Sequence, residues 1–190
     1  MVNNKIIDWY KDPQFIVAKL TPLSAEEATY ALREAWKKIY GQYPNNRSLA
    51  VLLAKSSLET SRWKKIWNFN FGNIKKKRNP DDGRNFTMFR CSEILNNKEC
   101  WFDPPHIQTH FVAYLSAQDG AEGYIKFVSQ KTGYKKACQK VIEGDPSGYA
   151  HELKVAGYYT ANEAKYTAGV VCLFSEWMKK MPALLAWKPE

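Results

Sequence analysis

Apolar residues recur at helical spacing along most of the chain. Leu32 and Trp36 are four residues apart within the first such run, as expected for one face of a helix. Ser24 and Glu27 form a capping box before this run, and Gly41 follows it. The pattern therefore predicts a helix that ends near Gly41.

A second apolar run follows the turn at residues 43–46. Leu52, Glu59 and Trp63 are separated by seven and four residues, so they share one face of a helix. We expect this helix to reach Trp63 and to carry Glu59 on its apolar side. Glu59 should then be at least half buried.

The second half of the chain also has helical spacing. Helix starts are indicated by polar caps and helix ends by Gly or Pro: the starts are Ser116 with Asp119, Asp145-Pro146, and Thr160 with Glu163, and the ends are Gly133, Gly144, Gly157 and Pro182. These signals predict four further helices, at about residues 116–133, 134–142, 146–157 and 160–180.

Residues 75–110 are the only β-like region in the sequence. The segments 86–91 and 100–102 predict a small hairpin, preceded by a basic run at 75–78 and a turn at 80–83. The fold class we expect is mainly α, with this hairpin lobe inserted between helices and flanking a substrate cleft. The whole chain, residues 1–190, should form one domain, because 190 residues suit a single core.

Charge and composition limit the partners without fixing them. A net charge of +9 favours polyanions, which include nucleic acid, anionic lipid and bacterial cell wall. The 14% aromatic content fits a filled core or a sugar-binding cleft. No stretch is apolar enough to span a membrane and the start has no signal-peptide pattern, so we expect a chain made in the cytoplasm without membrane insertion.

The four cysteines leave two pairings open. Cys91 and Cys100 bracket the predicted hairpin and would face each other across it, whereas Cys138 and Cys172 lie in two predicted helices. A chain made in the cytosol usually keeps its thiols reduced. The sequence does not decide between thiols and disulfides.

Glu59 has two interpretations. An ordinary carboxylate near a helix end would pair with Lys55 or Arg62, and helical spacing alone favours this reading. A buried carboxyl group tends to be protonated, which is the state that a general acid needs to protonate a glycosidic oxygen. The surrounding segment favours the second interpretation.

Three blocks of sequence resemble the glucosaminidase family of lysozyme-like peptidoglycan hydrolases. Residues 58–63 (LETSRW) and 70–75 (NFGNIK) are similar to its Leu-Glu-Ser-Gly-Trp and Asn-Leu-Phe-Gly-Ile-Lys signature. Residues 111–116 (FVAYLS) and 149–160 (YAHELKVAGYYT) resemble its later motifs, in the same order. The resemblance implies a lysozyme-like α+β fold in which Glu59 is the catalytic acid.

The chain departs from the family pattern at three places. Arg62 stands where the family has Gly, Asn73 is an insertion, and Ala161-Asn162 replaces an Asp-Pro pair. The hairpin lobe also differs from the family, and in that family the lobe supplies the second carboxylate. Glu93 is the best match for this group, with Glu99 and Asp103 in reserve.

Further site residues follow from the resemblance. Tyr158 would position the sugar or the charge that develops at its anomeric carbon, and Tyr166 occupies the place of a later family tyrosine. Asn70 and Phe71 would line the cleft floor beneath Glu59, and Trp101 would form a stacking wall for a pyranose ring.

Cofactor and metal chemistry has little support in the sequence. His106 and His110 lie four residues apart but lack the Glu of a metalloprotease motif, and the spacing of Cys91 and Cys100 is not that of a zinc site. No phosphate loop or dinucleotide fingerprint is present. We therefore expect no metal and no cofactor.

The sequence predicts an enzyme that cleaves β-1,4 bonds of bacterial peptidoglycan, with N-acetylglucosaminidase specificity implied by the family. A lytic transglycosylase or muramidase that acts through a single Glu remains open, as does a non-catalytic wall-binding or virion protein. Nucleic-acid binding rests on charge alone, so we expect peptidoglycan as the partner, no nucleic acid and a monomer. A phage endolysin or virion component is the setting we expect.

Overall fold

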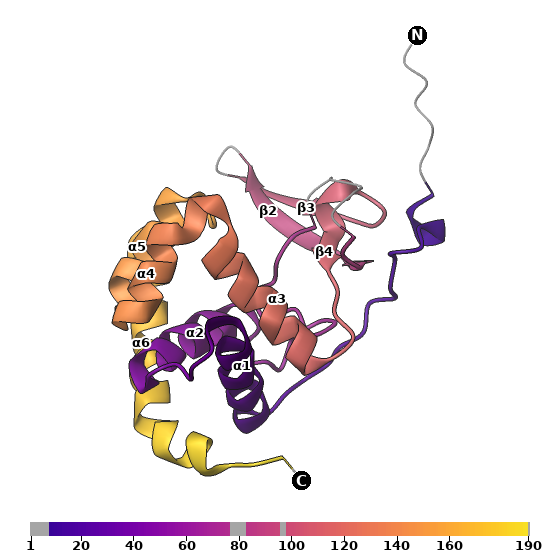
Figure 1. The fold of residues 1–190 in the computed structure, drawn as a ribbon. Coiled ribbons are helices and arrows are strands. Elements are labelled where there is room, and N and C mark those ends of the chain that lie inside the picture. Colours follow the sequence, from indigo (N-terminus) through magenta and orange to yellow (C-terminus); the bar gives the residue numbers. More distant parts are fainter. Residues whose placement is uncertain (1–7, 77–82, 96–97, 190) are drawn as a thin grey trace.

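The computed structural model describes residues 8–76, 83–95 and 98–189. In these ranges the helices form one body, and the strands form a lobe beside it (Figure 1). The helices are α1 (Ala25–Tyr40), α2 (Asn46–Glu59), α3 (Ala117–Gln130), α4 (Lys135–Glu143), α5 (Pro146–Val155) and α6 (Glu163–Ala186). The strands are β1 (Phe86–Met88), β2 (Cys91–Leu95), β3 (Lys98–Phe102) and β4 (His110–Val112). Three short 3-10 helices cover Trp9–Lys11, Ile107–Thr109 and Thr132–Tyr134.

Helix α2 lies at the centre of the helical body and packs against α1, α4 and α6. Every residue from position 48 to position 57 is buried. Two tryptophans fix its last turn: the indole of Trp63 donates to Ser56 Oγ at 2.9 Å, and that of Trp177 in α6 donates to Ser57 Oγ at 3.0 Å. The two indole rings also contact each other, with centroids 5.2 Å apart. The end of α2 is therefore held rigidly.

Most of the predicted helix ends are confirmed, because their signals are local. Ser24 and Glu27 make both hydrogen bonds of the capping box, and Gly41 ends α1 in the left-handed conformation. Gly144 ends α4 in the same conformation, and the side chain of Asp145 caps α5. The mainly α prediction is confirmed.

The last helix differs from the prediction at both ends. Its N-cap is Asn162, whose side chain accepts from Lys165 N at 3.1 Å, rather than Thr160. The helix also continues through Pro182 to Ala186. Met181 and Leu184 are buried on either side of this proline, so packing outweighs the loss of one backbone hydrogen bond.

The lobe contains two strand pairs rather than the single hairpin expected. β2 pairs with β3, in a register that sets Glu93 opposite Cys100, whereas β1 pairs with β4. The segment expected as one strand therefore divides at Phe89 and Arg90. The N-terminal segment crosses from the lobe to α1 and adds a bridge between Phe15 and Phe86 (Figure 1). The turn expected at residues 80–83 and the end of the basic run at 75–78 lie largely outside the described residues.

All four cysteines are free thiols. Cys91 faces Phe102 in the register and Cys100 faces Glu93, so the two cysteines are diagonal rather than opposite across the hairpin. Diagonal neighbours are usually too far apart for a disulfide. Cys138, which is buried, and Cys172, which is exposed, are not bonded to each other either.

Within the described ranges, no helix is both long enough and apolar enough to cross a membrane.

Candidate active site

Glu59 is the last residue of α2, which ends four residues earlier than predicted. Ser61, Arg62 and Trp63 follow with φ of 52°, 54° and 59°, so the backbone turns left-handed at once. This turn directs Trp63 under the helix, where it is fully buried. Trp63 lies on the buried side, as its spacing predicted. It reaches the core from the left-handed segment after α2, because the helix does not extend to this residue.

The carboxylate of Glu59 lies in a half-enclosed position, with 19% of its side chain exposed. This confirms the predicted burial. Its Oε1 accepts a hydrogen bond from the hydroxyl of Tyr166 at 2.9 Å, and Lys55 Nζ lies 3.9 Å away. Arg62 pairs with Glu176 at 2.8 Å instead. Of the two ion pairs considered for Glu59, the structure thus contains the one with Lys55, at the long limit of such a contact.

Lys55 is fully buried one turn before Glu59, and the sequence analysis did not include it in the site. Its ammonium donates to the hydroxyl of Tyr158 and to the carbonyl of Gly72, the latter at 3.3 Å. Burial lowers the pKa of Lys55 to about 8, and the charge of Glu59 acts in the opposite direction. The position four residues before Glu59 was the signal that could have identified it.

Two tyrosines that line the cleft with Glu59 are Tyr158 and Tyr166. The hydroxyl of Tyr158 donates to the carbonyl of Gly72 at 2.5 Å and accepts from the ammonium of Lys55, so two hydrogen bonds fix its position. Burial and then the charge of Glu59 raise the pKa of both phenols, which keeps them protonated as donors. Tyr159 stacks on Tyr166 with ring centroids 3.7 Å apart, and this contact fixes the ring that bonds Glu59.

A cleft of about 840 Å³ lies between the helical body and the lobe, and both Glu59 and Glu93 line it. Tyr158 and Tyr166 also line this cleft. Glu93 comes from β2, where Lys75 Nζ pairs with its carboxylate at 2.8 Å. The two carboxylates thus reach one cavity from different parts of the fold. Glycoside hydrolysis by two carboxylates uses a pair of acidic side chains that line one substrate cleft.

The two reserve carboxylates lie elsewhere. Asp103 pairs with Arg90 at 3.3 Å and is largely exposed, and Glu99 is exposed on β3. Neither of them lines the cleft. Among the three carboxylates considered for the lobe, the geometry brings only Glu93 to the cavity of Glu59.

Asn70 and Phe71 do not line the cleft as we expected, because both side chains are buried beneath it. The amide of Asn70 donates to the carbonyls of Ile74 and Val112, each at 3.0 Å, and accepts from Ile74 N at 2.8 Å. Phe71 belongs to the core, and its carbonyl accepts from Ser56 Oγ at 2.8 Å. Both residues support the cleft floor from below.

Trp101 is also absent from the cleft wall. Side chains alternate between the two faces of a strand, and Cys100 shares the face of Glu93, so Trp101 lies on the opposite face of the hairpin. Trp101 is 54% exposed, and the guanidinium of Arg90 lies over its ring, 4.7 Å from the ring centroid. The stacking wall that we expected from Trp101 is therefore not formed in this arrangement.

The histidines that were considered as metal ligands serve packing and turn formation. His106 Nδ1 accepts from Gln108 N at 3.1 Å, and its ring stacks on Phe102. His110 is buried against Phe86 and Trp9. No group of three or more His, Cys, Asp or Glu within the described residues could hold a metal ion.

Solved structures with a similar fold give a context for this cleft. A mutant peptidoglycan hydrolase from Sphingomonas sp. A1 has a TM-score of 0.63 and 18% identity over 83% of this chain and 99% of that one. The autolysin Auto catalytic domain from Listeria monocytogenes has a TM-score of 0.55 and 18% identity, covering 80% of this chain and 81% of that one. A glycoside hydrolase domain of Salmonella typhimurium FlgJ has a TM-score of 0.52 and 15% identity, covering 79% and 92%.

The sequence itself matches no protein-family model and no curated protein. At 15–18% identity the structural likeness shows the fold, and the roles of individual residues have to be argued from the cleft itself. The expected mainly α architecture with a β lobe is confirmed. This chain shares its fold with a peptidoglycan hydrolase, the catalytic domain of an autolysin and a glycoside hydrolase domain.

Proposed function

We propose that this protein is a peptidoglycan hydrolase that cleaves β-1,4 glycosidic bonds of the glycan strand, with Glu59 as general acid. The observation that carries the proposal is the shared cleft, into which α2 brings Glu59 and the lobe brings Glu93. The fold shared with a peptidoglycan hydrolase, an autolysin and a glycoside hydrolase domain supports the substrate class.

The roles of the side chains follow from their contacts. Glu59 in its protonated form would donate its proton to the glycosidic oxygen as the bond to the anomeric carbon breaks. Tyr166 holds the carboxyl group through its 2.9 Å hydrogen bond, which fixes the direction of proton transfer. Glu93 would activate a water molecule or attack the anomeric carbon, and Lys75 orients it from the same wall.

N-acetylglucosaminidase specificity is the finer form of this proposal, and it rests on the sequence blocks around Glu59. The competing mechanism is a lytic transglycosylase, in which Glu59 alone acts first as acid and then as base, and the 6-hydroxyl of the muramic sugar replaces water. The two mechanisms differ in whether Glu93 is needed and in the chemical end that they leave.

Mass spectrometry of muropeptides released from purified sacculi tests the proposal. The wild type should release fragments with reducing N-acetylglucosamine ends, and both Glu59→Gln and Glu93→Gln should lose activity by at least about a thousandfold. Glu34→Gln on α1 is the matched control, because Glu34 does not line the cleft. Anhydromuramic ends with an active Glu93→Gln variant would instead favour the transglycosylase.

Binding to sacculi without any released fragment would overturn the enzymatic proposal in favour of a wall-binding protein.

The setting that we propose is a phage lysin or virion component. Immunodetection in purified phage particles against the cleared host lysate would separate these two locations, and export by an uninfected host would contradict both.

A further inference from the structure

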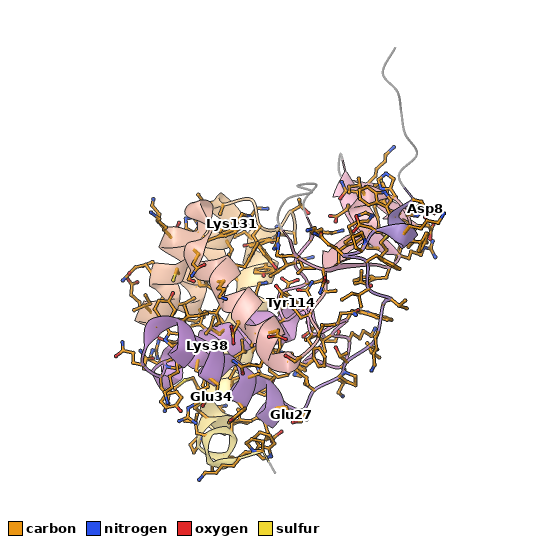
Figure 2. All side chains as sticks on the ribbon, turned by 45° about the vertical axis from the view of Figure 1, so that its right-hand side comes forward. Asp8, Glu27, Glu34, Lys38, Tyr114 and Lys131 are labelled. Carbon is orange, nitrogen blue, oxygen red and sulfur yellow. The ribbon has the colours of Figure 1, made fainter. Side chains whose placement is uncertain are left out.

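Lys55 is a cation buried inside the helical body. Its side chain has no exposed surface, whereas Lys38 on α1 lies at the surface (Figure 2), with 67% of its side chain exposed. Taking an ammonium out of water is costly, and a methionine would fill the same space without this cost. The charge of Lys55 therefore needs an explanation other than the stability of the core.

Two hydrogen bonds orient the ammonium of Lys55. It donates to the hydroxyl of Tyr158 and, at 3.3 Å, to the carbonyl of Gly72. Tyr158 donates to the same carbonyl at 2.5 Å, so the three groups hold one another in place. The ammonium also lies 4.1 Å from the ring centroid of Tyr158 and 5.2 Å from that of Tyr124. These contacts fix its position before any substrate binds.

The two oxygens of the Glu59 carboxyl group have different surroundings. Oε1 accepts a hydrogen bond from Tyr166 at 2.9 Å and lies 3.9 Å from Lys55 Nζ. Over the parts of the chain that the structure describes, Oε2 has no hydrogen bond to the protein. The proton of the acid is therefore placed on Oε2. When it moves to the glycosidic oxygen, the negative charge that remains is shared by both oxygens, and Oε1 carries part of it beside Lys55.

We propose that Lys55 is a positioning residue for the reaction, whose ammonium supplies the counter-charge for the Glu59 carboxylate that forms as the acid gives up its proton. The inference rests on the proposed function, because it takes Glu59 as the proton donor. It applies to hydrolysis and to transglycosylation, since Glu59 first acts as an acid in both. A cation that is already fixed stabilises the carboxylate without reorienting during the reaction.

The other titratable groups around Lys55 and Glu59 are phenols. They are Tyr124 of α3, Tyr149 of α5, Tyr158, and Tyr166 of α6, and burial raises the pKa of each. They should stay protonated below about pH 10. Among the described residues, neither Lys55 nor Glu59 has an ion pair with α1 or α4. Burial lowers the pKa of Lys55 to about 8, so most of it carries its charge at neutral and acidic pH.

Two neutral variants separate the charge of Lys55 from its hydrogen bonds. Lys55→Gln keeps an N–H donor for Tyr158, whereas Lys55→Met has none. On soluble glycan strands at acidic pH, both should lower kcat about tenfold per folded molecule and leave KM unchanged, because Lys55 acts through Glu59 and is closed to the sugar. A loss of kcat confined to Lys55→Met, or no loss in either variant, would overturn the inference.

A pH profile tests the electrostatic role, which a packing role would not affect. A cation beside a carboxyl group favours loss of its proton, so the alkaline limb of kcat/KM should move up by about one pH unit in both variants. Lys64→Met is the matched control, because Lys64 is exposed just beyond α2, and it should keep the wild-type profile. Coincident profiles for the wild type and Lys55→Gln would contradict the counter-charge.

An NMR titration of labelled lysine keeps this test separate from the proposed function. The titration midpoint of Lys55 should lie about one pH unit lower in Glu59→Gln than in the wild type, because the charge of Glu59 raises the pKa of Lys55. This comparison requires no cleavage. Equal midpoints would overturn the counter-charge. A lowered midpoint in a protein that releases no fragment from sacculi would overturn only the proposed reaction.

Discussion

Lys55 makes the stability of the fold depend on pH. Its ammonium is fully buried, and burial lowers its pKa to about 8, against 10.5 for an ordinary lysine. Between these two values the unfolded chain keeps a proton that the folded protein has released. By linkage, the unfolding free energy must rise as pH increases through this window. At neutral pH, by contrast, the buried charge destabilises the fold.

The size of the effect follows from the two pKa values. The full difference corresponds to about 3 kcal/mol, of which about 2 kcal/mol is relieved between pH 7 and pH 9.5. The window should stop there, because burial raises the pKa of Tyr124 and Tyr149. Such phenols ionise first in the unfolded chain, so above about pH 10 they favour unfolding.

Urea unfolding at several pH values from 7 to 9.5 measures this effect. The unfolding free energy of the wild type should rise by about 2 kcal/mol more than that of Lys55→Met, whose side chain fills the same space without a charge. Lys64→Met, at an exposed position just beyond α2, should follow the wild type. The reasoning would be refuted if the unfolding free energy of the wild type changed with pH in parallel with that of Lys55→Met, or with that of Lys55→Gln as a second variant.

Three further predictions concern the end of α2 and the support of the cleft. Arg62→Gly should be about 1 kcal/mol more stable in urea unfolding than Arg62→Ala. Both variants lose the ion pair with Glu176, and only glycine relieves the left-handed φ of 54°. Equal unfolding midpoints for the two variants would contradict this prediction. Gly120→Ala should lower the unfolding free energy by about 3 kcal/mol, since its Cβ would lie 2.0 Å from a backbone oxygen. Gly133→Ala, with open space around it, should change stability by less than about 0.5 kcal/mol. Tyr166→Phe should reduce kcat on sacculi about tenfold while the melting temperature changes little, and an unaltered kcat would exclude a role of its hydrogen bond to the acid.

The helical part of the fold was predictable because its signals are local. Ser24, Gly41 and Gly144 act on the turn in which they stand, and each ends or begins a helix where the sequence indicated. The last helix was predicted less well. Pro182 is a local stop signal, and the burial of Met181 outweighs it.

The site was predictable only in part, because most of it depends on tertiary pairing. The segment around Glu59 indicated this residue as a candidate acid, but nothing local indicated that Tyr166, 107 residues away, would bond to it. Trp101 was assigned to the cleft on residue type, and the strand register turns it to the other face. Lys55 was missed because a lysine on an apolar helix face is normally read as an exposed charge.

The amide of Asn70 joins the two places where the chain passes between the helical body and the lobe. One of its hydrogen bonds goes to Ile74, where the chain enters the lobe, and another goes to Val112, where it leaves. Glu59 belongs to the body and Glu93 to the lobe, so this one side chain ties together the two chain crossings that connect the parts carrying these carboxylates. Under the proposed two-carboxylate mechanism, the separation of the carboxylates would select between inversion and retention at the anomeric carbon. Asn70, which is buried beneath the cleft, would then help to set the stereochemistry of the product without touching the sugar.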